Sequence, residues 1–123
     1  MTKYLYILKT NIILLFTLLS SATLIADTHT INSGSYYYSP SSLTINVGDT
    51  VNWYNDGGFH NVNANINSIT NQPYNNPETF GSSATSEVGA LIYSHVFTIS
   101  GTYNYDCSIG NHAQLGMVGA INV

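Results

Sequence analysis

Basic residues are nearly absent from this sequence of 123 residues. It contains no Arg, and its two Lys residues, Lys3 and Lys9, lie within the first nine positions. Proteins that bind nucleic acid rely on Lys and Arg to contact the phosphates, so nucleic acid is excluded as a partner. The sequence also contains a single Cys, which excludes an internal disulfide. Charged residues make up only 7% of the chain, too few for networks of ion pairs to stabilise the fold.

The two Lys residues precede a short apolar stretch. Residues 12–26 are mostly apolar and end in small side chains, which is typical of a secretory signal peptide. Cleavage after Ala22 fits the small-residue rule, cleavage after Ala26 is the other candidate, and an uncleaved membrane anchor is the alternative. We therefore expect residues 1–26 to be a signal peptide and residues 27–123 to form one domain. The protein is expected to be exported, periplasmic or secreted, with no stable membrane insertion after processing.

The expected mature chain is strongly acidic. Residues 27–123 hold all six acidic residues and no Lys or Arg, so their side-chain charge is −6 with His neutral. Stability must then come from apolar burial, hydrogen bonds or a metal, because a domain of about 100 residues buries only roughly 60 to 65% of its unfolded surface. The acidity would speed encounter with a basic partner, or it would serve only to keep the protein in solution. The sequence leaves both roles open.

Alternation of apolar and polar residues predicts an all-β fold. Leu43 to Val47 alternates, Gly48-Asp49 turns the chain, and Thr50 to Asn55 alternates again, which predicts a strand, tight turn, strand unit. Extended segments are also expected at residues 59–64, 93–99, 102–107 and 117–123. Residues 65–87 are rich in Asn, Ser, Thr, Pro and Gly, which predicts a long loop. Short strands at these spacings favour a two-sheet Greek-key β-sandwich with Trp53 and most Tyr residues in its core.

Three potential metal ligands fall within eleven residues. Cys107, His112 and Met117 surround the loop between the last two predicted strands, and His60 follows Asp56-Gly57-Gly58 on an earlier one. A Cys, two His and a weak axial Met define the trigonal copper geometry used for one-electron transfer. Structural zinc sites favour more thiolates and rarely use Met. Each residue taken alone is more simply a packed core or surface residue, but four donors in this order point to copper.

The sequence blocks around these residues resemble the plastocyanin, azurin and pseudoazurin family of small blue copper proteins, the cupredoxins. The blocks are Leu43-Thr-Ile-Asn-Val-Gly-Asp-Thr-Val-Asn-Trp-Tyr-Asn55, Phe59-His-Asn-Val62, Gly101-Thr-Tyr-Asn-Tyr-Asp-Cys107 and Gly116-Met-Val-Gly-Ala-Ile-Asn-Val123. The resemblance implies a cupredoxin-like β-sandwich in which His60, Cys107 and His112 are the equatorial ligands of one type 1 copper and Met117 is the axial ligand. It further implies that Asn61 bonds across to the ligand loop near Ser108. The spacing Cys-x4-His-x4-Met is longer than that of plastocyanin and looks more like rusticyanin and auracyanin.

The two other histidines have weaker claims to a function. His95 shares parity with Phe97 in a predicted strand, so core or edge packing is expected. If cleavage follows Ala26, the mature chain begins Asp27-Thr28-His29, and a terminal amine, two amides and a third-position imidazole can form a square-planar Cu(II) or Ni(II) site.

These features predict an electron carrier rather than an enzyme. We expect the copper to cycle between Cu(II) and Cu(I), with electrons leaving through His112, which Ala113, Leu115, Gly116, Gly57 and Gly58 would surround with an uncharged surface. The partners would be redox proteins, and the carrier is expected to be a monomer. Copper storage or delivery is the alternative, and a copper-free β-sandwich that binds other proteins is a third reading.

Overall fold

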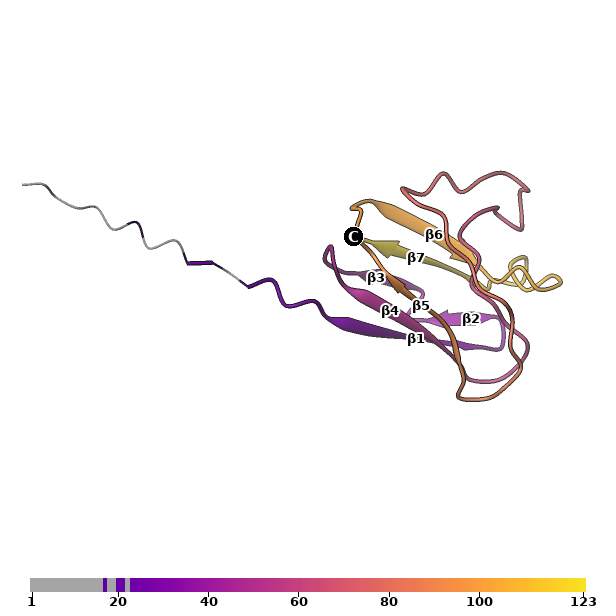
Figure 1. The fold of residues 1–123 in the computed structure, drawn as a ribbon. Coiled ribbons are helices and arrows are strands. Elements are labelled where there is room, and N and C mark those ends of the chain that lie inside the picture. Colours follow the sequence, from indigo (N-terminus) through magenta and orange to yellow (C-terminus); the bar gives the residue numbers. More distant parts are fainter. Residues whose placement is uncertain (1–16, 18–19, 22) are drawn as a thin grey trace, which may run out of the picture.

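The computed structural model describes residue 17, residues 20–21 and residues 23–123. Within this part the chain forms strands joined by turns and loops (Figure 1). The strands are β1 (Thr28–Gly34), β2 (Tyr37–Ser39), β3 (Ser42–Thr44), β4 (Thr50–Asn55), β5 (Leu91–Val96), β6 (Thr102–Asp106) and β7 (Val118–Asn122). The expected all-β class is confirmed.

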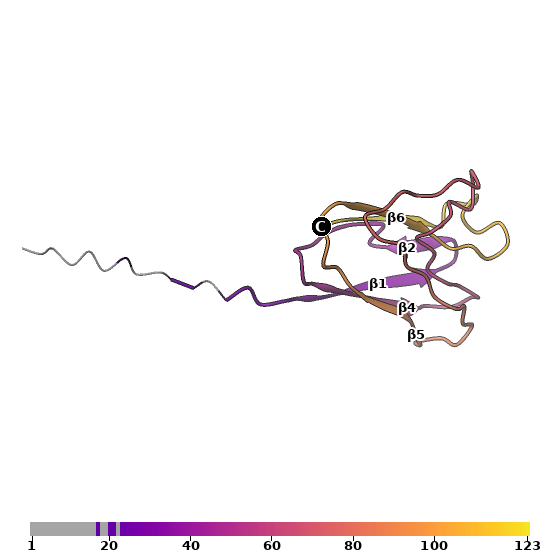
Figure 2. The same ribbon diagram turned by 45° about the horizontal axis from the view of Figure 1, so that its top comes forward.

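The strands form two sheets. One has the order β2-β1-β4-β5 and the other β3-β7-β6, and Figure 2 shows β6 in a separate layer from β1, β4 and β5. β1 pairs with β4 and β3 pairs with β7 in parallel, whereas the remaining neighbours are antiparallel. The chain therefore changes sheet after β2, after β3 and after β5, as the predicted Greek-key sandwich requires. The loop from β6 to β7 lies at the end of the molecule away from the C-terminus (Figure 1).

The strand, turn, strand unit predicted over residues 43–55 is present, but its two strands lie in different sheets. β3 pairs with β7, whereas β4 pairs with β1 and β5. Alternation identifies a strand from its own residues, but the choice of partner depends on distant segments: Ile45 N donates to Asn122 O at 2.8 Å, and Gly48 N donates to Phe97 O at 2.7 Å. β1 and β2 escape prediction from the sequence, because Ile31 is the sole aliphatic residue of β1 and leaves no alternation to detect.

The core lies between the sheets and is largely aromatic. Trp53 is fully buried, with its ring 5.4 Å from that of Tyr105 and 6.0 Å from those of Phe80 and Tyr93. The expected burial of Trp53 is confirmed, but the expectation that most Tyr side chains lie in the core is wrong: among the described residues only Tyr38, Tyr103 and Tyr105 are buried. Cys107 and Met117 are also fully buried and belong to the same core, so the predicted ligand loop is anchored to the sandwich at both ends.

A buried carboxylate holds the start of β1 against the turn before β4. Asp49 accepts hydrogen bonds from the backbone N–H of Asp27 at 2.9 Å and of Asn46 at 3.1 Å, and it lies 2.8 Å from His29 Nε2. These bonds, led by the one from Asp27, lower the pKa of Asp49 to about 2. The ordinary value for Asp is about 3.9.

This depressed pKa predicts acid sensitivity of the metal-free fold. A carboxylate with a lowered folded-state pKa stabilises the protein above its unfolded pKa, and that stability is lost as the pH falls through the folded value. We expect the melting temperature of the apoprotein to fall between about pH 5 and pH 2, and Asp49→Asn to flatten part of this dependence. Thermal unfolding across that range measures the effect. Glu87→Gln, at an exposed acid, is the control and should keep the wild-type profile; equal profiles for wild type and Asp49→Asn would contradict the assignment.

The expected signal peptide over residues 1–26, with its candidate cuts after Ala22 and Ala26, falls largely outside the described residues and stays a prediction. The start of the domain at residue 27 likewise stays a prediction. Across the described part of the chain, no helix is long and apolar enough to span a bilayer.

Candidate metal centre

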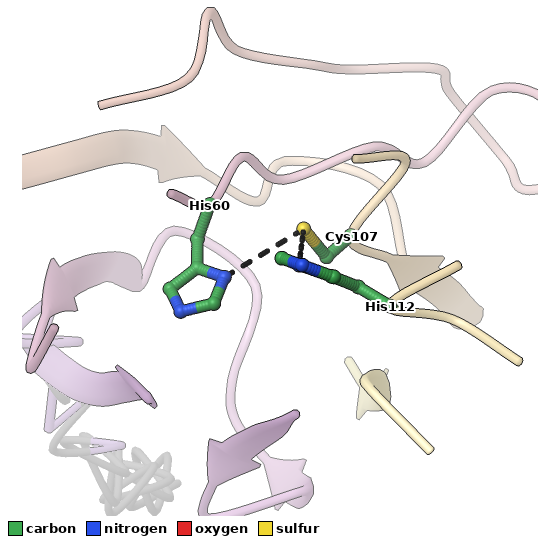
Figure 3. A group of neighbouring side chains, drawn as sticks. All are labelled: His60, Cys107 and His112. Atoms are coloured by element: carbon green, nitrogen blue, oxygen red, sulfur yellow. Dashed lines mark hydrogen bonds between the residues drawn. The ribbon is translucent and has the colours of Figure 1, made fainter. Parts of the chain in front are cut away.

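Three of the four predicted ligands converge at one end of the sandwich. The candidate ligand atoms of His60, Cys107 and His112 all lie within 4.8 Å of one another. Figure 3 shows both rings directed at the sulfur, which is 3.4 Å from His112 Nδ1 and 3.9 Å from His60 Nδ1. His60 is 47 residues away from Cys107, so the fold brings together donors that the sequence separates.

The loop from β6 to β7 closes on itself to place Cys107, His112 and Met117. Cys107 N donates to Met117 O at 3.1 Å, and Met117 N donates to His112 O at 3.0 Å. A further bond, from His112 N to Ile109 O at 3.0 Å, tightens the middle of the loop. Met117 is fully buried, and its backbone bonds to that of Cys107 and of His112; its role as the axial ligand stays a prediction.

His60 is held in the tautomer that a metal requires. Its Nε2 lies 2.7 Å from the carbonyl oxygen of Gly57, and a carbonyl only accepts, so Nε2 carries the proton and Nδ1 keeps a free lone pair toward Cys107. Burial lowers the pKa of His60 because it disfavours the imidazolium. Burial also raises the pKa of Cys107, so metal binding there must displace the thiol proton.

Asn55 shapes the turn that carries Gly57 and Gly58, although the sequence analysis gives it no role. Its side-chain N–H groups donate to Gly58 O at 3.0 Å, Glu87 O at 3.1 Å and Thr85 O at 3.3 Å, and its oxygen accepts from Gly57 N at 3.0 Å. A buried Asn at the end of a strand before two glycines is the one local signal for this role. This turn positions the carbonyl group of Gly57, which orients the His60 ring.

The two glycines provide a matched pair of mutations. Both have positive φ, but a Cβ on Gly58 would lie 2.6 Å from His60 Nε2, whereas a Cβ on Gly57 meets nothing within 4 Å. We expect Gly58→Ala to displace the His60 ring and weaken copper affinity by about 10- to 100-fold, the range found when the orientation of a ligand is lost. Gly57→Ala carries a similar backbone penalty of about 1 to 3 kcal/mol without that contact. Competition titrations with a copper chelator measure both, and equal affinities in the two variants would contradict the expectation.

The predicted bond between Asn61 and the ligand loop is present. Asn61 Nδ2 donates to Ser108 Oγ at 2.8 Å, and Ser108 N donates to Asn61 Oδ1 at 2.9 Å. Tyr38, on β2, donates its buried hydroxyl to Asn61 O at 2.5 Å. These bonds tie the segment after His60 to the residue after Cys107, so the two ligands are fixed relative to each other.

His112 is the more exposed of the two histidines at the site. Its ring makes an edge contact with the exposed Tyr36 at a centroid distance of 5.2 Å. A groove of about 520 Å³ reaches both rings and is also lined by Tyr36, Tyr37, Gly57, Gly58 and Phe59. Phe59 and Leu115 are exposed. Ala113 was expected on this surface, but it is buried and does not contribute to it. The surface around His112 is therefore more aromatic than the sequence suggested.

The two remaining histidines pair with carboxylates. His95 Nε2 lies 2.7 Å from Glu78 Oε1, and its ring stacks on Phe80 at 4.5 Å, which confirms the expected packing role. His29 lies in β1, paired with Val51 of β4, and its ring bonds to Asp49. An amino-terminal copper site at Asp27-Thr28-His29 would have to break the bond from Asp27 N to Asp49 and the pairing of β1 with β4, which weighs against it.

The donors fit copper. The site offers one buried soft sulfur and two imidazole nitrogens, a buried Met in the same loop, and no carboxylate among the converging groups in the described residues. This set suits a copper that changes oxidation state, and it is a poor match to an oxygen-preferring cation. The fold and site define a class: small β-sandwich proteins with a mononuclear metal site built from one cysteine and two histidines.

Comparisons with known proteins identify the family within that class. A family model described as copper binding proteins of the plastocyanin/azurin family matches residues 25–123. The plastocyanin of Scenedesmus fuscus is 35% identical over 102 residues, which cover 75% of this chain and 91% of that protein. A purple cupredoxin from Nitrosopumilus maritimus superimposes with a TM-score of 0.58 at 31% identity, covering 77% of this chain and 98% of that one. A reduced amicyanin variant gives a TM-score of 0.59 at 26% identity, covering 78% and 81%. The chain belongs to the plastocyanin/azurin family, the cupredoxins, and its cofactor is copper.

Proposed function

We propose that this chain is a type 1 (blue) copper protein that carries one electron at a time between redox partners, with His60, Cys107, His112 and Met117 as the ligands. The observation that carries the proposal is the convergence of one thiol and two imidazoles within 4.8 Å from two remote segments. When bound there, copper supplies a one-electron Cu(II)/Cu(I) couple. The residues around it hold the donors still: His60 is oriented by Gly57, and Cys107 by bonds to Met117 and through Ser108 to Asn61.

The half-buried ring of His112 is the proposed exit for the electron. Tyr36, Phe59 and Leu115 surround this end with exposed apolar side chains, which permits brief docking through a modest interface. Asp56 lines the adjoining groove and adds negative charge that favours a basic partner. The proposal includes an exported, monomeric carrier with no enzymatic activity.

Spectroscopy and voltammetry of the purified protein test the proposal. One equivalent of bound copper, an intense thiolate-to-copper visible band and a reversible one-electron wave are expected. A protein that binds copper but releases it on reduction, or exchanges electrons sluggishly, would favour storage or delivery. A colourless protein with only weak copper binding would favour the copper-free reading.

The axial role of Met117 has its own test. A thioether donor helps to stabilise Cu(II), so we expect Met117→Leu, which conserves volume in the buried site, to keep the copper and raise its reduction potential. Potentiometric titration of the blue band measures the change. A lowered potential would count against axial ligation.

A further inference from the structure

The residue before Cys107 is a buried acid. Alternation along β6 places Asp106 on the face of the exposed Thr102 and Asn104, yet Asp106 is 0% exposed. The cover comes from the long loop after residue 63, which lays Ser68 and Tyr74 over the carboxylate. A charge is costly to bury unless it is well bonded, so this arrangement calls for an explanation beyond packing.

Four hydrogen bonds satisfy the Asp106 carboxylate. Oδ1 accepts from Asn63 Nδ2 at 2.8 Å and Ser68 Oγ at 2.9 Å, and Oδ2 accepts from Ser68 N at 2.8 Å and Tyr74 Oη at 2.5 Å. Each oxygen thus receives one N–H group that can only donate, which suits the ionised form. Burial and the hydrogen bond to Asp106 raise the pKa of Tyr74, which keeps its hydroxyl a donor.

In the described part of the chain, no cationic side chain neutralises this carboxylate. The sequence contains no Arg, and its two Lys residues are Lys3 and Lys9. Among the described residues, each ion pair involves His29 or His95, with Asp49 and Glu78 as their partners. Within the described residues, the metal site at Cys107, the next residue along the chain, is therefore the strongest positive charge near Asp106 when copper is bound.

The backbone of Asp106 also ties the two ligand segments together. Asn63 N donates to Asp106 O at 2.8 Å, and Asp106 N donates to Asn63 O at 2.9 Å. The side chain of Asn61 makes two hydrogen bonds to Ser108. The residues before and after Cys107 are therefore both hydrogen-bonded to the segment that begins at His60.

We propose that Asp106 is a positioning and charge-setting residue of the copper site: it clamps Cys107 to the His60 segment and holds behind the sulfur a fixed negative charge that favours Cu(II) and lowers the reduction potential. This inference rests on the proposed function, since it requires copper at Cys107. Negative charge stabilises the more highly charged oxidation state, and the low dielectric around a buried group preserves the effect.

Asp106→Asn tests the charge with little change in shape. We expect the ratio of Cu(II) to Cu(I) at a fixed applied potential to fall about tenfold, which corresponds to a midpoint about 59 mV higher for one electron. Asp56→Asn removes the same charge from an exposed position at the same end of the molecule. Its shift should be smaller and should shrink as salt is added, whereas the Asp106 shift should persist because a buried charge is screened little.

Tyr74→Phe distinguishes a charge effect from a loosened site. It removes the hydrogen bond from the Tyr74 hydroxyl but keeps the Asp106 carboxylate, so the negative charge is less screened. We therefore expect the reduction potential to fall, a change opposite in sign to that in Asp106→Asn. Mere loosening would move both variants in the same direction. In the apoprotein, the Ser68 amide, which donates to Asp106, should exchange its hydrogen faster in Asp106→Asn than in wild type.

The outcomes separate the two proposals. Absence of a blue band and a reversible wave in wild type would refute the carrier function itself. If both are present in wild type, two results would refute the role of Asp106 and leave the carrier function standing. One is a change in reduction potential in Asp106→Asn no larger than that in Asp56→Asn. The other is an unchanged or raised reduction potential in Tyr74→Phe. If Asp106→Asn does not fold, Tyr74→Phe decides by the same criterion.

Discussion

Replacement of Cys107 by Ser is expected to abolish the intense visible band of the copper-loaded protein and to weaken copper affinity by about 100-fold or more. This loss exceeds the roughly 10- to 100-fold that follows when a residue supporting a metal ligand is removed. Cys107 Sγ lies 3.4 Å from His112 Nδ1 and 3.9 Å from His60 Nδ1. A serine hydroxyl is not ionised at neutral pH and cannot provide the covalent, charge-transferring bond of a thiolate. The visible spectrum and a chelator competition titration measure both effects.

The control for this variant is its own metal-free fold. Cys107 is fully buried, so a serine there costs stability of about 1 to 3 kcal/mol through a poorly bonded hydroxyl. The apoprotein should therefore still unfold cooperatively, at a lower temperature. An intense band that survives in Cys107→Ser would place the chromophore elsewhere and refute the site.

The identity of the site residues could be inferred from the sequence because their chemistry is local. Cys107, His112 and Met117 lie around one loop, and strands on either side hold the ends of that loop, so short spacing alone implies proximity. The sequence offered His60 as a fourth donor by residue type alone, and its contact with the loop rested on the family resemblance, because nothing in its own surroundings specifies contact with a residue 47 positions away. The convergence of His60, Cys107 and His112 in the structure supports both steps.

The supporting residues were harder to foresee because their roles arise from tertiary contacts. The alternation of β6 assigns Asp106 to solvent, and only the path of the long loop covers it. The steric importance of Gly58 depends on the orientation of the His60 ring. A sequence pattern reports which face of a strand a residue occupies, but it does not report what covers that face.

The same limit applies to the fold. β4 and β6 follow from alternation, since each carries buried residues at every second position in most of its length, whereas β7 has one buried residue, Ile121. β1 lacks that pattern and is held by pairing with both β2 and β4. The assignment of β3 and β4 to different sheets likewise depends on partners more than 40 residues away, which a local turn signal does not encode.

Gly119→Ala is expected to destabilise the protein by about 2 to 3 kcal/mol, near the upper end for overpacking of a core, and to lower the melting temperature by about 10 °C or more. Gly119 pairs directly with Tyr105 across β6 and β7. A Cβ at this position would lie 2.2 Å from Tyr105 Cζ. The Tyr105 ring has no room to retreat, because it is buried between Tyr38 at 4.8 Å and Trp53 at 5.4 Å.

Gly81→Ala is the matched control for this prediction, because its Cβ would make an ordinary contact of 3.5 Å with Val62 O. It should unfold within about 1 kcal/mol of wild type. A double-mutant cycle with Tyr105→Leu isolates the clash: the cost of Gly119→Ala should fall sharply once the ring is removed. An undiminished cost in the Tyr105→Leu background would mean that the strain lies in the β7 backbone and not in the contact with the ring. Tyr105 lies two residues before Cys107 on β6. A displacement of β6 by the clash would therefore reach the ligand loop, and Gly119→Ala should broaden the visible band of the copper-loaded protein as well as lower its stability.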